Sequence, residues 1–220
     1  MLICESYLLI YLERWKDRDT ITITNPAGVC LVGAGIMDLI LRGKLMIEGK
    51  KLITQDTSPT GVAYLDEILT MIKDSKKIRK VNRWVIGLAG YHSLQRYNLI
   101  FQSLERQGTV KFEQIVSGRI FIKWKYEFTN PEVISSLLER IEKIFTETID
   151  PEIELLCLLN LLRISRLFKI SVSEEYRKMA KFRMEQLLQA GDYDPKHLEM
   201  ILRIKKAYKA AERDRYQSIV

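Results

Sequence analysis

Histidine and cysteine are scarce in this sequence, and their scarcity limits the chemistry it can perform. The only histidines are His92 and His197, and neither stands within metal-ligand spacing of the other or of a cysteine. Cys4, Cys30 and Cys157 are odd in number and far apart. That spacing predicts buried thiols in a reducing compartment and not a disulfide framework. We therefore expect no metal site and no cofactor.

Long apolar runs and disorder-promoting composition are also lacking. The longest apolar run, residues 155–162, is interrupted by Asn160 and is far shorter than the roughly 20 residues that span a bilayer. Glu5 stands where the basic region of a signal peptide would be, so we expect the chain to stay in the cytosol. With 11 glycines, 5 prolines and 47% hydrophobic residues among 220, we expect one compact domain over residues 1–220.

Two short motifs imitate catalytic sites but lack the pattern that such sites need. Gly28, Gly33 and Gly35 imitate a glycine-rich phosphate loop, yet no hydrophobic strand precedes them and no lysine with a hydroxyl residue follows. Asp66 and Glu67 are adjacent, so on a helix they point in different directions, and we expect exposed or capping roles for them. The sequence thus predicts no catalytic residues and a protein that is not an enzyme.

Residues 36–69 carry a clear succession of local signals. Apolar residues at helical spacing lead to Gly43, which favours the left-handed conformation that commonly ends a helix. Residues 45–47 and 51–53 are short β-type runs around a Glu-Gly-Lys turn, which predicts a tight hairpin. Proline and glycine at 58–61 then precede a second helical stripe.

The second half of the chain reads as helical. A capping residue precedes proline at Asn130-Pro131, Asp150-Pro151 and Asp194-Pro195, and Ser171 with Glu174 predicts a capping box for a fourth helix. The run from Leu155 to Phe168 is apolar on nearly every side, so we expect it to be buried at the centre. The predicted fold class is therefore mainly α: a compact helical domain around this leucine-rich helix, with two small β-hairpins.

The second hairpin belongs to a helix-then-hairpin unit over residues 94–124. We expect strands near residues 110–112 and 119–124, joined through Ser117-Gly118. Helix followed by hairpin is also the core of a winged helix, which binds nucleic acid. Polar side chains that could face a nucleic-acid groove occur on this helix at Gln95, Arg96, Asn98 and Gln102. A nucleic-acid-binding protein is therefore the alternative function.

The balance of charge points to an anionic partner. The formal net charge is +7, so anionic surfaces attract the protein. One basic cluster follows the second helical stripe and comprises Lys73, Lys76, Lys77, Arg79, Lys80 and Arg83. A second lies near the C-terminus and comprises Arg203, Lys205, Lys206, Lys209 and Arg213. Either cluster could be a solvated face, and charge alone does not separate membrane from nucleic acid.

Several motifs together resemble the Golgi phosphoprotein 3 family. They are Leu41-Arg42-Gly43-Lys44-Leu45, Pro59-Thr60-Gly61 and Leu65-Asp66-Glu67, followed in the same order by residues 81–84, 104–108 and 150–151. The resemblance spans most of the chain. It implies a mostly helical, membrane-peripheral adaptor at the cytosolic face of a membrane, the Golgi in a eukaryote. Family members bind phosphatidylinositol 4-phosphate, tether cytosolic tails of membrane glycosyltransferases and can form homo-oligomers.

The family's phosphoinositide pocket uses a tryptophan and arginines that this sequence does not keep. At the corresponding positions stand Ile23, Val32, Leu94 and Tyr97. A phosphate group requires several charge-assisted hydrogen bonds, which these side chains do not offer. We therefore expect binding to anionic phospholipid without that pocket.

The remaining candidates form a basic face and an apolar tip. The candidates for binding lipid or another anion are Lys77, Arg79, Lys80, Arg83 and Arg96. Each cation near an anionic membrane contributes about 1 kcal/mol. The membrane-inserting candidates are Ile115 and Val116, at the tip nearest the family's inserting hairpin. Besides nucleic-acid binding, a helical scaffold without a lipid role is the other alternative.

Overall fold

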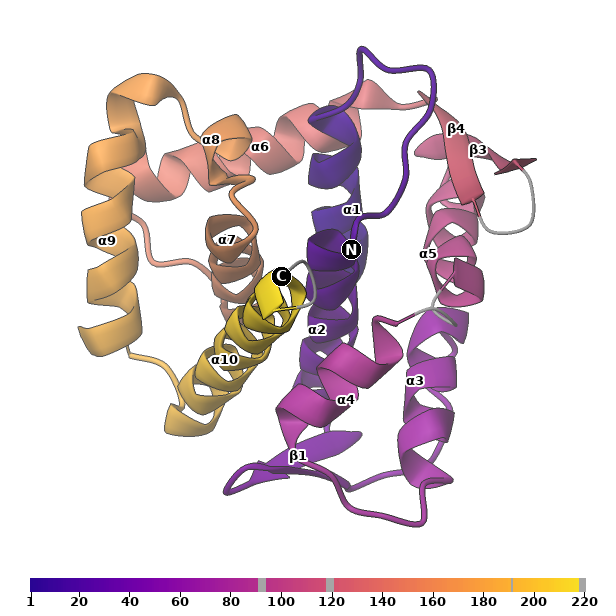
Figure 1. The fold of residues 1–220 in the computed structure, drawn as a ribbon. Coiled ribbons are helices and arrows are strands. Elements are labelled where there is room, and N and C mark those ends of the chain that lie inside the picture. The colour runs from indigo at the N-terminus through magenta and orange to yellow at the C-terminus, as the bar shows by residue number, and fades with distance from the viewer. Residues whose placement is uncertain (91–93, 118–120, 191, 218–220) are drawn as a thin grey trace.

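The computed structural model describes residues 1–90, 94–117, 121–190 and 192–217, which form helices and two hairpins (Figure 1). The helices are α1 (Ile3–Glu13), α2 (Asn25–Leu41), α3 (Ala63–Lys73), α4 (Val81–Leu88), α5 (Leu94–Arg106), α6 (Pro131–Thr146), α7 (Ile153–Ile164), α8 (Phe168–Ser171), α9 (Arg177–Ala190) and α10 (Pro195–Gln217). The strands are β1 (Leu45–Glu48), β2 (Lys51–Thr54), β3 (Val110–Ser117) and β4 (Phe121–Phe128). The predicted mainly α fold with two small hairpins is confirmed.

Three helices share the centre of the molecule. The leucine-rich α7 is buried along residues 156–162, as predicted. However, α1 is buried along residues 3–12 and α2 along residues 27–39, and α2 contacts α1, α3, α4, α7 and α10. Cys4, Cys30 and Cys157 are free and buried within this core, also as predicted, and burial raises the pKa of the Cys30 thiol to about 12.

The glycines of α2 lie where other helices approach it closely. Gly28 faces the Tyr97 ring of α5, Gly33 faces Ile204 of α10, and Gly35 faces α3. A Cβ atom at Gly33 would lie 2.7 Å from Ile204 Cγ2, which is too close for an undisturbed contact. These glycines therefore allow close packing of helices, and their spacing reflects packing and not a phosphate loop.

The first hairpin forms as the sequence predicts. β1 and β2 are antiparallel, with Leu45 opposite Thr54 and Glu48 opposite Lys51. Gly43, after α2, and Gly49, in the hairpin turn, have φ angles of 68° and 59°. Other residues rarely adopt this left-handed region, so glycine is the residue that permits both turns.

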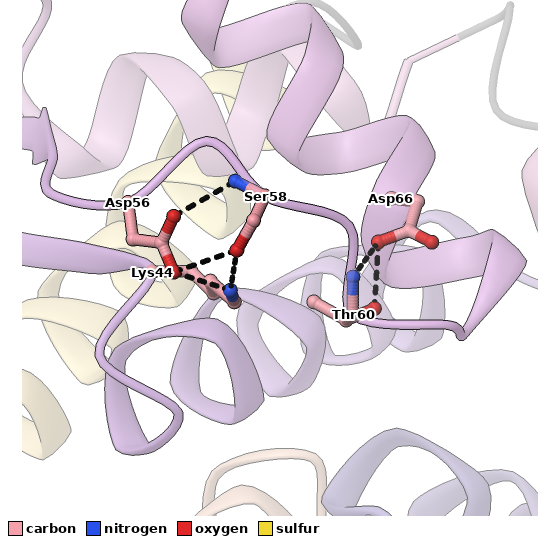
Figure 2. Close-up of polar contacts among 5 residues, drawn as sticks. All are labelled: Lys44, Asp56, Ser58, Thr60 and Asp66. Atoms are coloured by element: carbon pink, nitrogen blue, oxygen red, sulfur yellow. Dashed lines mark hydrogen bonds and ion pairs between the residues drawn. The ribbon is translucent and has the colours of Figure 1, made fainter.

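Side-chain hydrogen bonds fix the connection from β2 to α3 (Figure 2). The Lys44 ammonium group donates to Ser58 Oγ at 2.6 Å and also contacts Asp56, whose other oxygen accepts the Ser58 N–H at 2.8 Å. The Thr60 N–H and hydroxyl donate to Asp66 Oδ1 at 2.6 and 2.7 Å. Asp66 is not the N-cap of α3, which is Val62, so the capping role expected for Asp66 does not appear in the usual form. Its carboxylate instead holds the loop residue Thr60 against the first turns of the helix.

The second hairpin is longer than the sequence indicates. β3 and β4 pair antiparallel from Val110 opposite Phe128 to Ser117 opposite Phe121, whereas shorter strands were expected. Charged residues alternate along both strands and interrupt the apolar signal, although they simply face solvent. The turn was expected at residue 118 and the second strand was expected to start at residue 119. Both residues lie outside the described residues.

Three predicted helix boundaries are wrong. Glu152, and not Asp150, is the N-cap of α7, because the backbone is still extended at Glu152 (φ −57°, ψ 155°). Ser171 ends α8 and Ser173 caps the following 3-10 turn, Glu174–Tyr176 (η2), so the expected capping box does not form. The buried helix also stops at Ile164, because Arg166 adopts a φ of 62° that an α-helix excludes.

Candidate functional site

The connection between α3 and α4, residues 74–80, carries four of the six cations of the first basic cluster and is here called the basic segment. The Ser75 hydroxyl donates to the Lys77 carbonyl at 3.0 Å and accepts the Lys77 N–H at 3.3 Å. Further along, the backbone of residues 79–81 pairs with that of residues 50–52 through two N–H···O bonds of 3.0 Å. These bonds hold the basic segment against the first hairpin.

A cavity of about 570 Å³, here called the α3–α4 cavity, opens between the end of α3, this connection and α4. Its charged lining residues are four cations and one acid, namely Lys76, Lys77, Arg79, Arg83 and Asp74. Its other lining residues are neutral or apolar, namely Met71, Ser75, Trp84, Gly87 and Leu88. The cavity therefore combines positive charge with an apolar wall.

The four cations of the cavity are available to a ligand. All four side chains are exposed. None has a carboxylate within 4.0 Å in the ranges that the structure describes. An incoming anion would therefore not have to displace an existing ion pair.

Trp84 gives the cavity its aromatic wall and positions one of the cations. The indole is 7% exposed, on the inner side of α4. The guanidinium carbon of Arg79 lies 5.4 Å from the centroid of the ring. This is within the range of about 6 Å for a cation–π interaction, which keeps the charge of Arg79 beside the cavity.

Arg96, a predicted anion-binding residue, lies behind the cavity wall. Its side chain is only 3% exposed. One terminal nitrogen donates to the Leu88 carbonyl at 2.7 Å, and the other contacts Met71 Sδ at 3.2 Å and Glu67 at 3.4 Å. Because Leu88 and Met71 both line the cavity, Arg96 supports its wall and does not present its charge to the opening.

The predicted cations divide between two hollows. Lys77, Arg79 and Arg83 line the α3–α4 cavity, but Lys80 lines a neighbouring groove against α10. Sequence reasoning missed Met71 as a lining residue and also Ile78, which is 64% exposed within the basic segment. An apolar residue between cations was the signal that could have identified Ile78.

The predicted membrane-inserting residues lie elsewhere on the molecule. Val116 is 63% exposed near the end of β3, and Ile115 is partly buried. In Figure 1 the β3–β4 hairpin lies at the upper right, whereas β1, next to the basic segment, lies at the bottom. The basic segment and the β3–β4 strands are therefore at opposite ends of the molecule in this view.

The polar side chains of α5 are largely occupied by internal contacts. Arg96 is buried, and Asn98 accepts the Trp124 indole N–H at 2.7 Å and also donates to Gln114. Gln95 and Gln102 are exposed. Asn98 is turned toward the β3–β4 hairpin and Arg96 toward α3 and α4, so two of the four residues expected to face a groove are turned toward the protein.

Comparison with known families covers nearly the whole chain. Residues 3–203 of the 220 match the family model of Golgi phosphoprotein 3 (GPP34). The chain belongs to the Golgi phosphoprotein 3 family. Comparison with curated proteins gives no match. The resemblance inferred from the ordered motifs is confirmed.

In this Golgi phosphoprotein 3 family member, the positions that the resemblance assigned to the family's lipid pocket lie in or against the core. Val32 is fully buried and Tyr97 is 2% exposed. Tyr97 approaches Gly28 so closely that a Cβ atom there would lie 2.1 Å from the tyrosine hydroxyl oxygen. Ile23 and Leu94 are partly buried against the core.

None of the helices in the described residues is long and apolar enough to cross a membrane.

Proposed function

We propose that this Golgi phosphoprotein 3 family member is a non-enzymatic, peripheral membrane protein that binds anionic phospholipid through the α3–α4 cavity and its basic rim. The observation that carries the proposal is the composition of the cavity. Four cations that have no carboxylate within 4.0 Å among the described residues surround a wall that includes Trp84 and the partly exposed Met71. Lipid headgroups at a membrane surface offer both anionic and apolar atoms to such a site.

The number of cations is sufficient for reversible attachment. Lys76, Lys77, Arg79, Lys80 and Arg83 lie on one connection and the helix that follows it. At about 1 kcal/mol for each cation near an anionic surface, the segment supplies several kcal/mol before any apolar contact is made. The exposed Ile78 adds apolar area at the same place.

The proposed lipid preference is general. By the resemblance, the positions of the family's phosphoinositide pocket are Ile23, Val32 and Leu94, whose side chains have no hydrogen-bond donor, and Tyr97, which is buried and carries no charge. We propose binding to anionic lipid without selection for phosphatidylinositol 4-phosphate.

From family membership alone, we further propose that the protein works at the cytosolic face of a membrane, which is the Golgi where the cell has one. There it would tether cytosolic tails of membrane proteins such as glycosyltransferases and form homo-oligomers.

Vesicle co-sedimentation tests the lipid proposal. The full chain is mixed at near-physiological salt with neutral vesicles, with vesicles containing phosphatidylserine, and with vesicles containing phosphatidylinositol 4-phosphate. We expect similar binding to both anionic types and none to neutral vesicles. A strong preference for the phosphoinositide would contradict the general lipid preference, and absence of binding to all three would contradict the proposal.

A matched pair of variants locates the binding surface. Lys77→Glu with Arg83→Glu should abolish binding to phosphatidylserine vesicles. Lys178→Glu with Lys181→Glu changes the net charge equally at exposed residues of α9, which lies across the molecule (Figure 1), and should retain binding. Equal loss in both pairs would mean that net charge alone attracts the protein. If the protein bound duplex DNA but no vesicles, this result would favour the nucleic-acid alternative.

A further inference from the structure

A second basic hollow lies between three segments that are far apart in the sequence. It has a volume of about 290 Å³ and is lined by Lys50, Lys80, Val81, Asn82, Arg203 and Lys206. Lys50 comes from the β1–β2 turn, residues 80–82 from the start of α4, and the other two from α10. We call it the α4–α10 groove.

The groove is built on a fixed backbone. The Val81 N–H donates to the Lys50 carbonyl at 3.0 Å, which joins the turn to the start of α4. On α10, Ile204 and Ala207 are fully buried, and α10 packs against α4. Arg203 precedes Ile204 and Lys206 precedes Ala207. Both cations consequently lie at the edge of the interface between α10 and α4.

Positive charge in the groove is largely uncompensated. Arg203 is paired with Glu199 of its own helix, at 2.9 Å. Lys50, Lys80 and Lys206 have no carboxylate within 4.0 Å among residues 1–90, 94–117, 121–190 and 192–217. Like charges gathered in a hollow repel one another, and a multivalent anion relieves this repulsion.

The polar groups around these lysines suit phosphate. Asn82, at the second position of α4, adds a half-buried amide to the lining. The groove also lies at the N-terminal end of α4, where the helix dipole favours negative charge. Ammonium groups converging from separate elements can surround a group that has several phosphate oxygens.

We propose that the α4–α10 groove binds a phosphate-bearing ligand with two or more negative charges, supplied either by a soluble polyphosphate or by the phosphomonoester headgroup of a lipid. The groove is separate from the α3–α4 cavity, because Lys50, Arg203 and Lys206 do not line that cavity. Only the connection that carries Lys80 is common to both, so the tests leave Lys80 unchanged.

Isothermal titration of the full chain with inorganic tripolyphosphate at near-physiological salt tests the proposal. We expect saturable binding to one site. Lys50→Glu with Lys206→Glu should weaken it by at least about tenfold, because two charge-assisted contacts are lost. The control pair, Lys181→Glu with Lys209→Glu, makes the same charge change at exposed residues of α9 and α10, outside the groove, and should bind nearly as the wild type. Absence of saturable binding, or equal loss in the two pairs, would overturn the proposal.

Two further experiments distinguish a soluble phosphate ligand from a lipid headgroup, and the α4–α10 groove from the α3–α4 cavity. Vesicles containing phosphatidic acid present the same phosphate chemistry on a lipid. If the groove pair, Lys50→Glu with Lys206→Glu, binds these vesicles more weakly than the control pair does, a lipid headgroup is a source of the phosphate. If the groove pair loses binding only to tripolyphosphate, the ligand is soluble. Lys77→Glu with Arg83→Glu should retain tripolyphosphate binding even though this variant no longer binds phosphatidylserine vesicles. If Lys77→Glu with Arg83→Glu lost tripolyphosphate binding while the groove pair retained it, the phosphate site would be the α3–α4 cavity. That result would overturn the proposal.

Discussion

Arg79 and Lys80 are neighbours in the sequence but line different hollows. Arg79 lies over Trp84 beside the α3–α4 cavity, with its guanidinium carbon 5.4 Å from the ring centroid, and Lys80 lines the groove against α10. The backbone at Lys80 is extended (φ −66°, ψ 150°), and successive side chains of an extended chain point to opposite sides. One short segment thus supplies cations to two separate hollows.

The exposed Ile78 provides a test of which end of the molecule enters the membrane. We predict that Ile78→Ser reduces co-sedimentation with phosphatidylserine vesicles several-fold, because it removes an apolar contact without changing charge. Val116→Ser in β3 should have little effect, because the β3–β4 strands lie at the other end of the molecule from β1 and the basic segment beside it (Figure 1). The reverse result would favour the β3–β4 hairpin tip predicted from the sequence.

Arg96 is predicted to act on stability more than on anion binding. Arg96→Met removes the donor to the Leu88 carbonyl and leaves Glu67 without this partner, so we expect a loss of about 1–3 kcal/mol in the free energy of unfolding. Urea denaturation measures this. Arg106→Met, at an exposed position of α5, should change stability by less than about 0.5 kcal/mol. If Arg96→Met kept its stability but lost vesicle binding, Arg96 would be a direct ligand after all.

Asp38 is predicted to make stability depend on pH. Its carboxylate accepts the N–H groups of Ile3 and Cys4 at 3.0 and 3.2 Å, yet burial outweighs these bonds and raises the pKa of Asp38 from 3.8 to about 6. The folded protein therefore holds this proton more tightly than the unfolded chain. The resulting stabilisation is present below the unfolded pKa and is lost as the pH rises through the folded pKa.

Asp38→Asn isolates this effect from other titrating groups. Between pH values of about 4 and 7, the wild type should lose on the order of 2–3 kcal/mol relative to the variant, which carries no ionisable group there. Urea denaturation at several pH values gives the comparison. Parallel stability curves for the two proteins would show that Asp38 titrates as an ordinary carboxyl.

Gly35 is predicted to be required for the approach of α3 to α2. A Cβ atom there would lie 2.8 Å from both Ile68 Cδ1 and Tyr64 Cε1. Gly35→Ala should cost about 1–3 kcal/mol in overpacking, which exceeds the gain in helix propensity of roughly 0.5–1 kcal/mol. Gly87→Ala in α4 meets no atom within 4 Å and should be neutral or stabilising. Thermal denaturation of the two variants distinguishes them, and similar shifts in both would contradict the packing argument.

Features that depend on nearby residues were predictable from the sequence. The end of α2 just before Gly43 and the first hairpin involve residues only a few positions apart. The longer β3–β4 hairpin was not predictable to its ends, because its stability comes partly from Trp124, which is fully buried and stacks on Phe101 of α5 at 5.6 Å.

For the candidate sites, the sequence indicated the cations but not their surroundings. The run from Lys76 to Arg83 stands out in the sequence, yet nothing local shows that Lys80 would join Lys50 and residues of α10. Arg96 was predicted to be a surface cation. Its burial depends on contacts with α3 and the end of α4, which no local sequence pattern shows.

The sequence by itself determined the family, the helical class, the turn positions and the excess of positive charge, because each follows from composition or from short-range pattern. Only the tertiary structure decided which cations share a hollow, which one is buried, and that the basic segment lies apart from the β3–β4 strands. The physical reason is that these relationships arise from packing between helices distant in the chain. Such packing is set by the shapes of many side chains together and not by any one segment.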